Sequence, residues 1–159
     1  VLTVAGANVP VASHVATSDG ILLTTAEGSL IVLAPDGEER WRKDGVGDLN
    51  GTPARAGKTI AVANRAGRVA LFDVRSGKPH GTLELGAGAW HGLVGAKGVL
   101  MAGRKDGSFW AYDLANNEVV ADVPMKLSPR VPPRRLGRDR ILLGLEGGCV
   151  GVIDVPRAP

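Results

Sequence analysis

Three histidines, a set of turn aspartates and a group of arginines are the residues of this sequence that could carry chemistry. His14 and His91 fall in short runs that we expect to form strands, so one hypothesis is a metal ion held between them. A catalytic zinc ion takes three protein ligands, and no Asp, Glu or Cys accompanies either histidine on its run. We therefore predict a solvated or hydrogen-bonded role for His14 and His91, an exposed His80, and no metal site.

Aspartates stand at equivalent places near the end of three apolar runs. These residues are Asp73, Asp113 and Asp154. An aspartate that precedes a turn can accept hydrogen bonds from the turn backbone, so we assign all three to turn formation rather than to catalysis. No Ser-His-Asp order, phosphate-cradling glycine loop or pair of carboxylates can be recognised. The sequence therefore predicts no catalytic residue and no bound cofactor.

The most uneven feature of the charge distribution is a group of five arginines within eleven residues, with one acid among them, Asp139. The group consists of Arg130, Arg134, Arg135, Arg138 and Arg140. Guanidinium groups bind carboxylates and phosphates in a bidentate manner, so one interpretation is a docking patch. The alternative is a solvated surface on which one or two of the arginines form ion pairs with Asp139 and Glu146. Aromatic residues that could stack on bases are absent nearby, which favours an acidic protein partner over nucleic acid.

Two tryptophans receive different interpretations. Trp90 lies in the linker before the expected strand from His91 to Gly95, and a tryptophan on a loop is a candidate partner contact. Trp110 lies in a run whose two faces both carry bulky residues, so we expect it between two packed sheets. The predicted partner-binding residues are Trp90, His91, Arg130, Arg134, Arg135 and Arg138.

Composition limits the fold. The chain has 159 residues, of which 44% are hydrophobic and 22% charged, which is typical of one globular domain. No apolar run approaches the roughly 20 residues that a spanning helix needs. Its 23 glycines, 10 prolines and 4% aromatic residues favour an all-β protein with many turns. The net charge of +3 is too small to indicate a nucleic-acid binder. We expect the single Cys149 to be a small buried group in a strand.

The elements that position these residues repeat along the chain. Strand-like runs alternate with glycine turns, and Gly28, Gly67, Gly107 and Gly148 follow one another at intervals of 39, 40 and 41 residues. This is the period of a four-stranded propeller blade. We predict an all-β β-propeller of four antiparallel four-stranded blades, about 8–45, 50–86, 90–125 and 129–154, in a single domain or propeller segment spanning residues 1–159.

The two ends of this pattern are incomplete. Residues Val1 to Ala5 read as a strand without a hairpin partner. The fourth blade, whose inner strand we expect from Arg130 to Leu136, lacks its outer strand. We expect the open edges to be covered. The first strand could complete the last blade within a four-bladed ring, a second copy could complete an eight-bladed ring, or a longer parent chain could supply the rest. The absence of a starting methionine favours a cut end at Val1 over a processed one.

The repeats resemble a known family. The segment from Pro10 to Trp41 places an inner-strand proline, Asp-Gly, Gly-Ser-Leu-Ile-Val-Leu, Asp-Gly and Trp in the order of the PQQ-like propeller repeat, and the segments Gly67–Gly77 and Gly107–Asn117 match it. This repeat occurs in quinoprotein dehydrogenases and in the outer-membrane assembly lipoprotein. The family's docking tryptophan is present as Trp41 alone, since Leu83 and Val120 replace it in blades two and three. We expect weaker or different docking there.

The resemblance implies a bacterial protein of the cell envelope or periplasm and leaves the cytoplasm open. Our leading hypothesis is a soluble, non-catalytic PQQ-like propeller that acts as a protein-interaction scaffold for a protein partner, without a cofactor, nucleic acid or membrane span. One alternative is a segment of a quinoprotein oxidoreductase whose cofactor-binding blades lie outside this chain. The other is a ligand-sensing propeller domain of a larger protein such as a kinase. The repeat itself occurs in all three classes.

Overall fold

The computed structural model describes residues 11–49, 51–86 and 89–156, and for residues 89–91 the backbone alone. These residues contain fifteen strands and one short 3₁₀ turn, joined by turns and loops. The strands form four antiparallel sheets in which each strand pairs with its neighbours in the chain. The predicted all-β propeller fold is confirmed. The expected strand from Val1 to Ala5 lies outside the described residues.

Each sheet is one blade, and its strands run in chain order from the inside outward. Blade one contains β1 (Val11–Thr17), β2 (Gly20–Thr25), β3 (Leu30–Leu33) and β4 (Glu39–Lys43). Blade two contains β5 (Ala54–Ala56), β6 (Thr59–Ala63), β7 (Arg68–Asp73) and β8 (Pro79–Glu84). Blade three contains β9 (Ala89–Ala96), β10 (Val99–Arg104), β11 (Ser108–Asp113) and β12 (Glu118–Pro124). In blade four the described strands are β13 (Arg134–Leu136), β14 (Arg140–Gly144) and β15 (Val150–Asp154), with the turn η1 (Glu146–Gly148) before β15.

One backbone hydrogen bond recurs from blade to blade and confirms that the turn glycines are equivalent. The N–H after each outer strand donates to the carbonyl of the turn glycine of the same blade. These bonds are Val46 to Gly28 (2.9 Å), Leu85 to Gly67 (2.8 Å) and Met125 to Gly107 (3.2 Å). All four turn glycines, Gly148 included, have a positive φ of 76° to 91°, a conformation that glycine adopts without steric cost.

Blades pack face to face through apolar side chains. One buried cluster joins blades one and two, with Leu22 and Phe72 among its members. A second cluster joins blades two and three, and a third joins blades three and four. Strand β11 contributes side chains to both the second and the third cluster, because alternate side chains of a strand point to opposite faces. Trp110 is 3% exposed and Phe109 1% exposed, so the prediction that Trp110 lies between sheets is confirmed.

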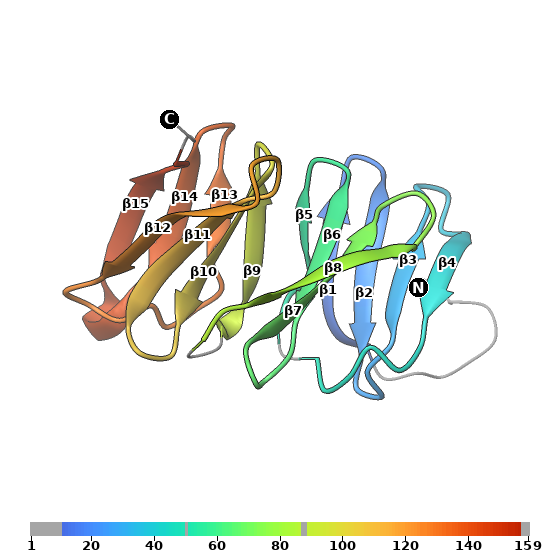
Figure 1. Ribbon diagram of the computed structural model, residues 1–159, viewed down its shortest axis with the longest axis horizontal. Coiled ribbons are helices and arrows are strands. Elements are labelled where there is room, and N and C mark those ends of the chain that lie inside the picture. The colour runs from blue at the N-terminus through green and yellow to red at the C-terminus, as the bar shows by residue number, and fades with distance from the viewer. Residues whose placement is uncertain (1–10, 50, 87–88, 157–159) are drawn as a thin grey trace.

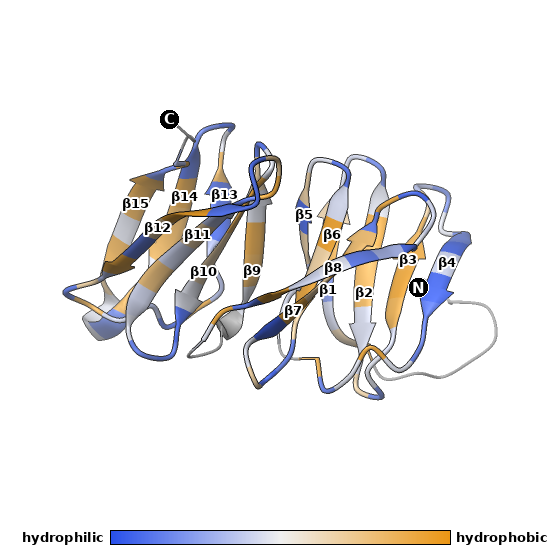
Figure 2. Ribbon diagram, in the orientation of Figure 1, coloured by the Kyte–Doolittle hydropathy of each residue, from blue (hydrophilic) through white to orange (hydrophobic). Residues whose placement is uncertain are grey.

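Figure 1 shows the four blades following one another along the longest axis of the molecule, with blade one and blade four at opposite ends. The outer strands β8 and β12 lie in front. Figure 2 shows that apolar residues concentrate on the central strands of each blade, whereas β4 is largely hydrophilic. This distribution fits sheets whose central strands are enclosed on both faces.

One face of blade four is bare. It carries Val150 and Val152, which are 67% and 51% exposed. The residues at the same hairpin positions in blade three, Phe109 and Ala111, are 1% and 0% exposed because blade four covers them. We call the surface of Leu142, Val150 and Val152 the forward face of blade four. No hydrophobic cluster of the described residues covers it.

Two local expectations were wrong. The inner strand of blade four was predicted from Arg130 to Leu136, but β13 begins at Arg134. Pro132 and Pro133 have no N–H group for a sheet ladder, so pairing starts after them. Cys149 is exposed rather than buried in a strand, because it lies between η1 and β15, at the end of the hairpin, where the blade offers little cover.

Candidate functional site

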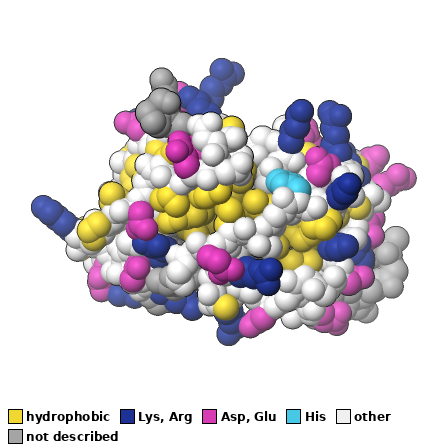
Figure 3. Space-filling view, in the orientation of Figure 1, with side chains coloured by type: hydrophobic (Ala, Val, Ile, Leu, Met, Phe, Trp, Pro, Cys, Tyr) yellow, Lys and Arg dark blue, Asp and Glu magenta, His cyan; other side chains and the backbone are white. Residues whose placement is uncertain are grey.

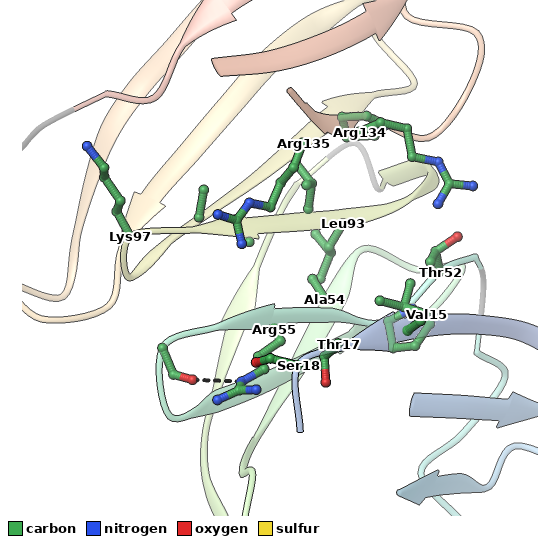
Figure 4. A pocket seen from close by; sticks show the side chains of 17 residues that line it. Val15, Thr17, Ser18, Thr52, Ala54, Arg55, Leu93, Lys97, Arg134 and Arg135 are labelled. Atoms are coloured by element: carbon green, nitrogen blue, oxygen red, sulfur yellow. Dashed lines mark hydrogen bonds between the residues drawn. The ribbon is translucent and has the colours of Figure 1, made fainter. Parts of the chain in front are cut away.

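The inner strands of all four blades meet at one cavity of about 700 Å³. Residues from β1, β5, β9 and β13, and from the hairpins that follow β1, β5 and β9, line it (Figure 4). A propeller gathers its inner strands in this way, so the cavity is a direct product of the repeat.

The wall between blades two and three is closed by direct contact of two backbones. Leu93 N–H donates to the carbonyl of Thr52 at 3.2 Å, which joins β9 to the segment that leads into β5. A Cβ added at Gly95 would lie 2.1 Å from the carbonyl oxygen of Arg55, and one at Gly92 would lie 2.4 Å from the backbone nitrogen of Thr52. Glycine at these positions therefore permits the close approach that makes this wall rigid.

Four cationic side chains line the cavity, and two of them are neutralised. Arg55 forms an ion pair with Asp19 and donates from Nε to the carbonyl of Gly57 at 3.0 Å. Lys97 forms an ion pair with Asp139. Arg134 and Arg135 are exposed and have no carboxylate partner among the described residues. The cavity therefore has an excess of positive charge, and this excess is carried by the two arginines of β13.

The floor of the cavity is apolar. Leu93 and Ala54 are 2% and 3% exposed, and Val15 and Pro133 add further apolar surface at the lining. No aromatic side chain is among the described residues that line it. The described lining residues thus combine an apolar base with cationic groups, without a ring on which a nucleic-acid base could stack.

The predicted arginine patch is divided by the structure. Arg134 and Arg135 line the cavity, whereas Arg130 and Arg138 are not among its lining residues. Arg130 lies before β13 and pairs with Glu146 at 2.7 Å. Arg138 is exposed in the turn between β13 and β14. Half of the predicted arginine contacts therefore face the cavity, and the others lie outside it.

The expected position of Trp90 was wrong. Trp90 was placed in a loop, but it lies in β9, which begins at Ala89. Ala89 pairs with Arg104 of β10 across a register shift, and this extends the strand to include Trp90. His91 lies in the same strand, and both side chains are outside the described part. His14 is exposed on β1 and does not line the cavity. His80 is exposed, as expected, with its ring nitrogen 3.3 Å from Oγ1 of Thr59.

The sequence reasoning missed the two neutralised cations of the cavity, Arg55 and Lys97. The signal was present in the repeat. In each blade a charged residue stands within two positions of the start of the second strand, at Asp19, Lys58, Lys97 and Asp139. Because these hairpins all turn at the same end of the inner strands, opposite signs on the hairpins of blades one and two, and again of blades three and four, predict ion pairs around the cavity mouth. The pair of Asp139 with Lys97 is of this kind, whereas Asp19 pairs with Arg55 on β5 rather than with Lys58.

Two of the three turn aspartates act as predicted. Asp73 Oδ1 accepts hydrogen bonds from Arg75 N–H (3.1 Å) and Ser76 N–H (2.8 Å), and Asp113 Oδ1 accepts from Ala115 N–H at 2.7 Å. The bonds from Ser76 are the main reason that the pKa of Asp73 lies below its usual value. Among the described residues, no group of three or more His, Cys, Asp or Glu side chains could hold a metal ion.

Consecutive up-and-down blades, packed face to face around inner strands that share a cavity, define a β-propeller module. A family model described as outer membrane protein assembly factor BamB matches residues 12–122, which is more than half of the chain. The chain therefore belongs to this PQQ-like propeller family, as the repeats indicated. No curated protein sequence matches the chain significantly.

Solved structures share the fold at low sequence identity. BamB from Moraxella catarrhalis is similar over 89% of this chain and 44% of its own, with 15% identity and a TM-score of 0.73. The computationally designed Ika4 protein is similar over 96% of both chains, with 14% identity and a TM-score of 0.72. The WD40 repeats of RRP9 match 94% of this chain and 52% of theirs, with 14% identity and a TM-score of 0.69. This chain thus spans about half the length of the BamB and RRP9 chains. No helix in its described part could cross a membrane.

Proposed function

We propose that this chain is a protein-interaction module, a rigid propeller scaffold that binds a partner with an acidic surface at the cavity of its inner strands. The observation that supports this most directly is the pair of Arg134 and Arg135. Both are exposed, both line the cavity, and neither has a carboxylate partner among the described residues. Unpaired guanidinium groups beside an apolar floor favour binding of carboxylates, since part of the surrounding water is already excluded.

The scaffold around the cavity is suited to binding without rearrangement. Three buried clusters hold the blades together, and the contact of β5 with β9 is made by backbone atoms. A surface fixed in this way loses little conformational entropy when a partner binds. This is the general advantage of repeat scaffolds in recognition.

The outer side of the molecule differs from the cavity. Figure 3 shows that the face seen there carries Lys and Arg side chains interspersed with Asp and Glu, with apolar strips between them. Mixed charge of this kind is typical of a solubilising surface. The contrast supports the cavity, rather than the outer strands, as the place where an acidic partner binds.

The remaining predicted contacts extend the proposal beyond the cavity. Arg138 and Arg130 lie near β13, in the turn after it and the segment before it. Trp90 and His91 are on β9, which supplies one wall of the cavity. We propose that these residues form the rim of the interface around Arg134 and Arg135.

A second candidate function is ligand sensing. The cavity volume of about 700 Å³ falls within the roughly 300–1,000 Å³ that small-molecule sites occupy. A sensory module would bind a small anion at the same arginines. The two functions differ in whether a polypeptide or a small molecule is the preferred occupant.

Panning a displayed library of random peptides on the immobilised chain tests the proposed function. We expect enrichment of peptides rich in Asp and Glu, because the cavity has an excess of positive charge. Their affinity should fall about tenfold or more in the variant Arg134→Glu/Arg135→Glu, which replaces attraction by repulsion. Biolayer interferometry of the enriched peptides measures the change.

The matched control is Arg40→Glu/Arg75→Glu, which alters the net charge equally at two exposed arginines outside the cavity. It should change the affinity by less than about twofold at physiological salt, since distant surface charges are screened. Equal loss of binding in both variants, or no loss in either, would contradict the proposal.

A further inference from the structure

The two uncompensated arginines point to different parts of the cavity. Arg134 and Arg135 are neighbours on a three-residue strand, and successive side chains of a strand diverge. Figure 4 shows their guanidinium groups extending in opposite directions from β13, with Leu93 lying between them. A single small anion therefore cannot engage both groups in a bidentate manner, whereas a ligand with two separated carboxylates can.

The surface between the two arginines determines which kind of side chain suits the middle of the ligand. Val15 is half-buried and Ala16 is exposed on β1, and with the small accessible parts of Leu93 and Ala54, which are 2% and 3% exposed, they present an apolar base. Covering this base with a polar or charged group would leave that group without hydrogen bonds. An apolar side chain between the two carboxylates fits the base.

The strand edges at the cavity can bind a peptide backbone. Strands β1 and β13 are edge strands of their sheets, and each has a sheet partner on one side among the described residues. Unpaired N–H and C=O groups of an edge strand pair readily with an extended peptide. A small anion would leave these groups unused.

We propose that the cavity binds one extended peptide segment that carries two acidic side chains on either side of an apolar one. The inference rests on the proposed function and names the partner chemistry at its site. Arg134 and Arg135 bind the carboxylates, Val15 and Ala16 provide most of the surface for the apolar side chain, and the edges of β1 and β13 bind the backbone.

Fluorescence anisotropy with labelled synthetic peptides tests the inference. The probe peptide has the core Glu-Gly-Leu-Gly-Glu between Gly-Ser flanks, and the comparison peptides replace both Glu by Gln or Leu by Ser. We expect the Gln peptide to bind about a hundredfold more weakly, because two charge-assisted contacts are lost. The Ser peptide should bind about tenfold more weakly, because it buries no apolar side chain.

A cavity-filling variant separates binding inside the cavity from general attraction to the surface. Ala16 is exposed and lines the cavity on β1, so Ala16→Trp should fill the space without disturbing a buried cluster and weaken binding about tenfold or more. The control is Ala26→Trp, at an exposed position in the turn after β2 that does not line the cavity. It should leave the affinity unchanged.

The outcomes distinguish this inference from the proposed function. If displayed peptides require Arg134 and Arg135 but Ala16→Trp has no effect on the probe peptide, the inference is wrong and the interaction function stands. If citrate binds more tightly than the probe peptide and displaces it, the occupant is a small anion and the inference is overturned. If neither the probe nor any displayed peptide binds, both proposals are wrong.

Discussion

The junction between blades one and two and the junction between blades two and three are built from different chemistry. At the first, Trp41 on β4 reaches across to blade two, where its Nε1–H donates to the carbonyl of Val74 at 3.0 Å. Its ring packs against Phe72 with centroids 6.4 Å apart and covers Gly77, where an added Cβ would lie 2.7 Å from the ring. One large side chain therefore provides both packing and a hydrogen bond.

The second junction has no tryptophan at this position. Strand β8 has Gly81 at the equivalent register position, opposite Leu71, and Leu83, two residues further along, contributes a smaller contact to the cluster between blades two and three. The polar link comes instead from Arg104 at the end of β10, which donates to the carbonyl of Leu85 in blade two at 3.1 Å and to Ser108 Oγ at 2.7 Å. Arg104 also pairs with Asp122. Blade docking was expected to be weaker or different here, and the structure shows that an arginine of the following blade supplies the hydrogen bond across the junction.

The comparison shows that the repeat fixes neither the position nor the chemistry of the docking residue. Trp41 lies opposite Val32, and the equivalent register positions of β8 and β12 are Gly81, opposite Leu71, and Ala121, opposite Ala111. The expectation that Leu83 and Val120 replace Trp41 was therefore wrong in register, although both pack into the cluster of the next junction. Where the side chain is small, a residue from the following blade can supply the hydrogen bond. Substitutions at the two junctions should therefore produce different signatures.

The largest effect is expected for Trp41→Ala. Removing a partly buried ring and its hydrogen bond should lower the free energy of unfolding by about 3 kcal/mol. Trp41→Phe keeps most of the packing and loses the hydrogen bond, so it should cost about 1 kcal/mol. Urea unfolding followed by circular dichroism measures both. Equal losses would mean that packing of the ring contributes little.

A smaller loss is expected for Arg104→Met. The Arg104 side chain is 14% exposed, and its removal leaves the carbonyl of the buried Leu85 without this donor, at a cost of about 2 kcal/mol. Arg68→Met is the matched control, because Arg68 is 60% exposed and lies 3.9 Å from Glu84; it should cost less than about 0.5 kcal/mol. A control loss as large as that of Arg104→Met would show that the arginine link is not specific to the junction.

The smallest expected effect is the excess cost of adding a side chain at Gly77, the glycine beneath Trp41. Gly77 and Gly57 have nearly equal φ values, +67° and +63°, but an added Cβ at Gly57 meets nothing within 4 Å. Gly57→Ala should therefore cost about 1 kcal/mol for the left-handed backbone, and Gly77→Ala about 1 kcal/mol more for displacing the ring. In a Trp41→Ala background the excess should vanish in thermal unfolding. An excess that persists there would have a cause other than the ring.

Most of the fold could be predicted from the sequence because the same hairpin pattern occurs once in each repeat. The glycine turns and the apolar runs agree with each other in every blade, so local and long-range signals point to one architecture. The errors fell where one copy departs from the pattern. Pro132 and Pro133 shortened β13, and the turn η1 left Cys149 outside a strand.

The candidate site was less predictable, because a cavity depends on which side chains the curvature of the blades brings together. The local density of arginines identified Arg134 and Arg135. It could not separate them from Arg130, which pairs with Glu146, since that depends on where β13 begins. Arg55 and Lys97 were missed because each is a single charge in its own segment, and only the arrangement of four inner strands places them at one cavity.

The bare forward face of blade four also affects how the molecule loses structure. Blades two and three are each enclosed from both sides, whereas Val150 and Val152 face solvent, so opening β14 from β15 disrupts one interblade interface rather than two. In a row of nearest-neighbour units, a unit that packs on one neighbour opens at a lower free energy than a unit that packs on two. We therefore expect the backbone of the β14–β15 hairpin to exchange with solvent faster than the hairpins of blades two and three, beside the strand that carries the two unpaired arginines.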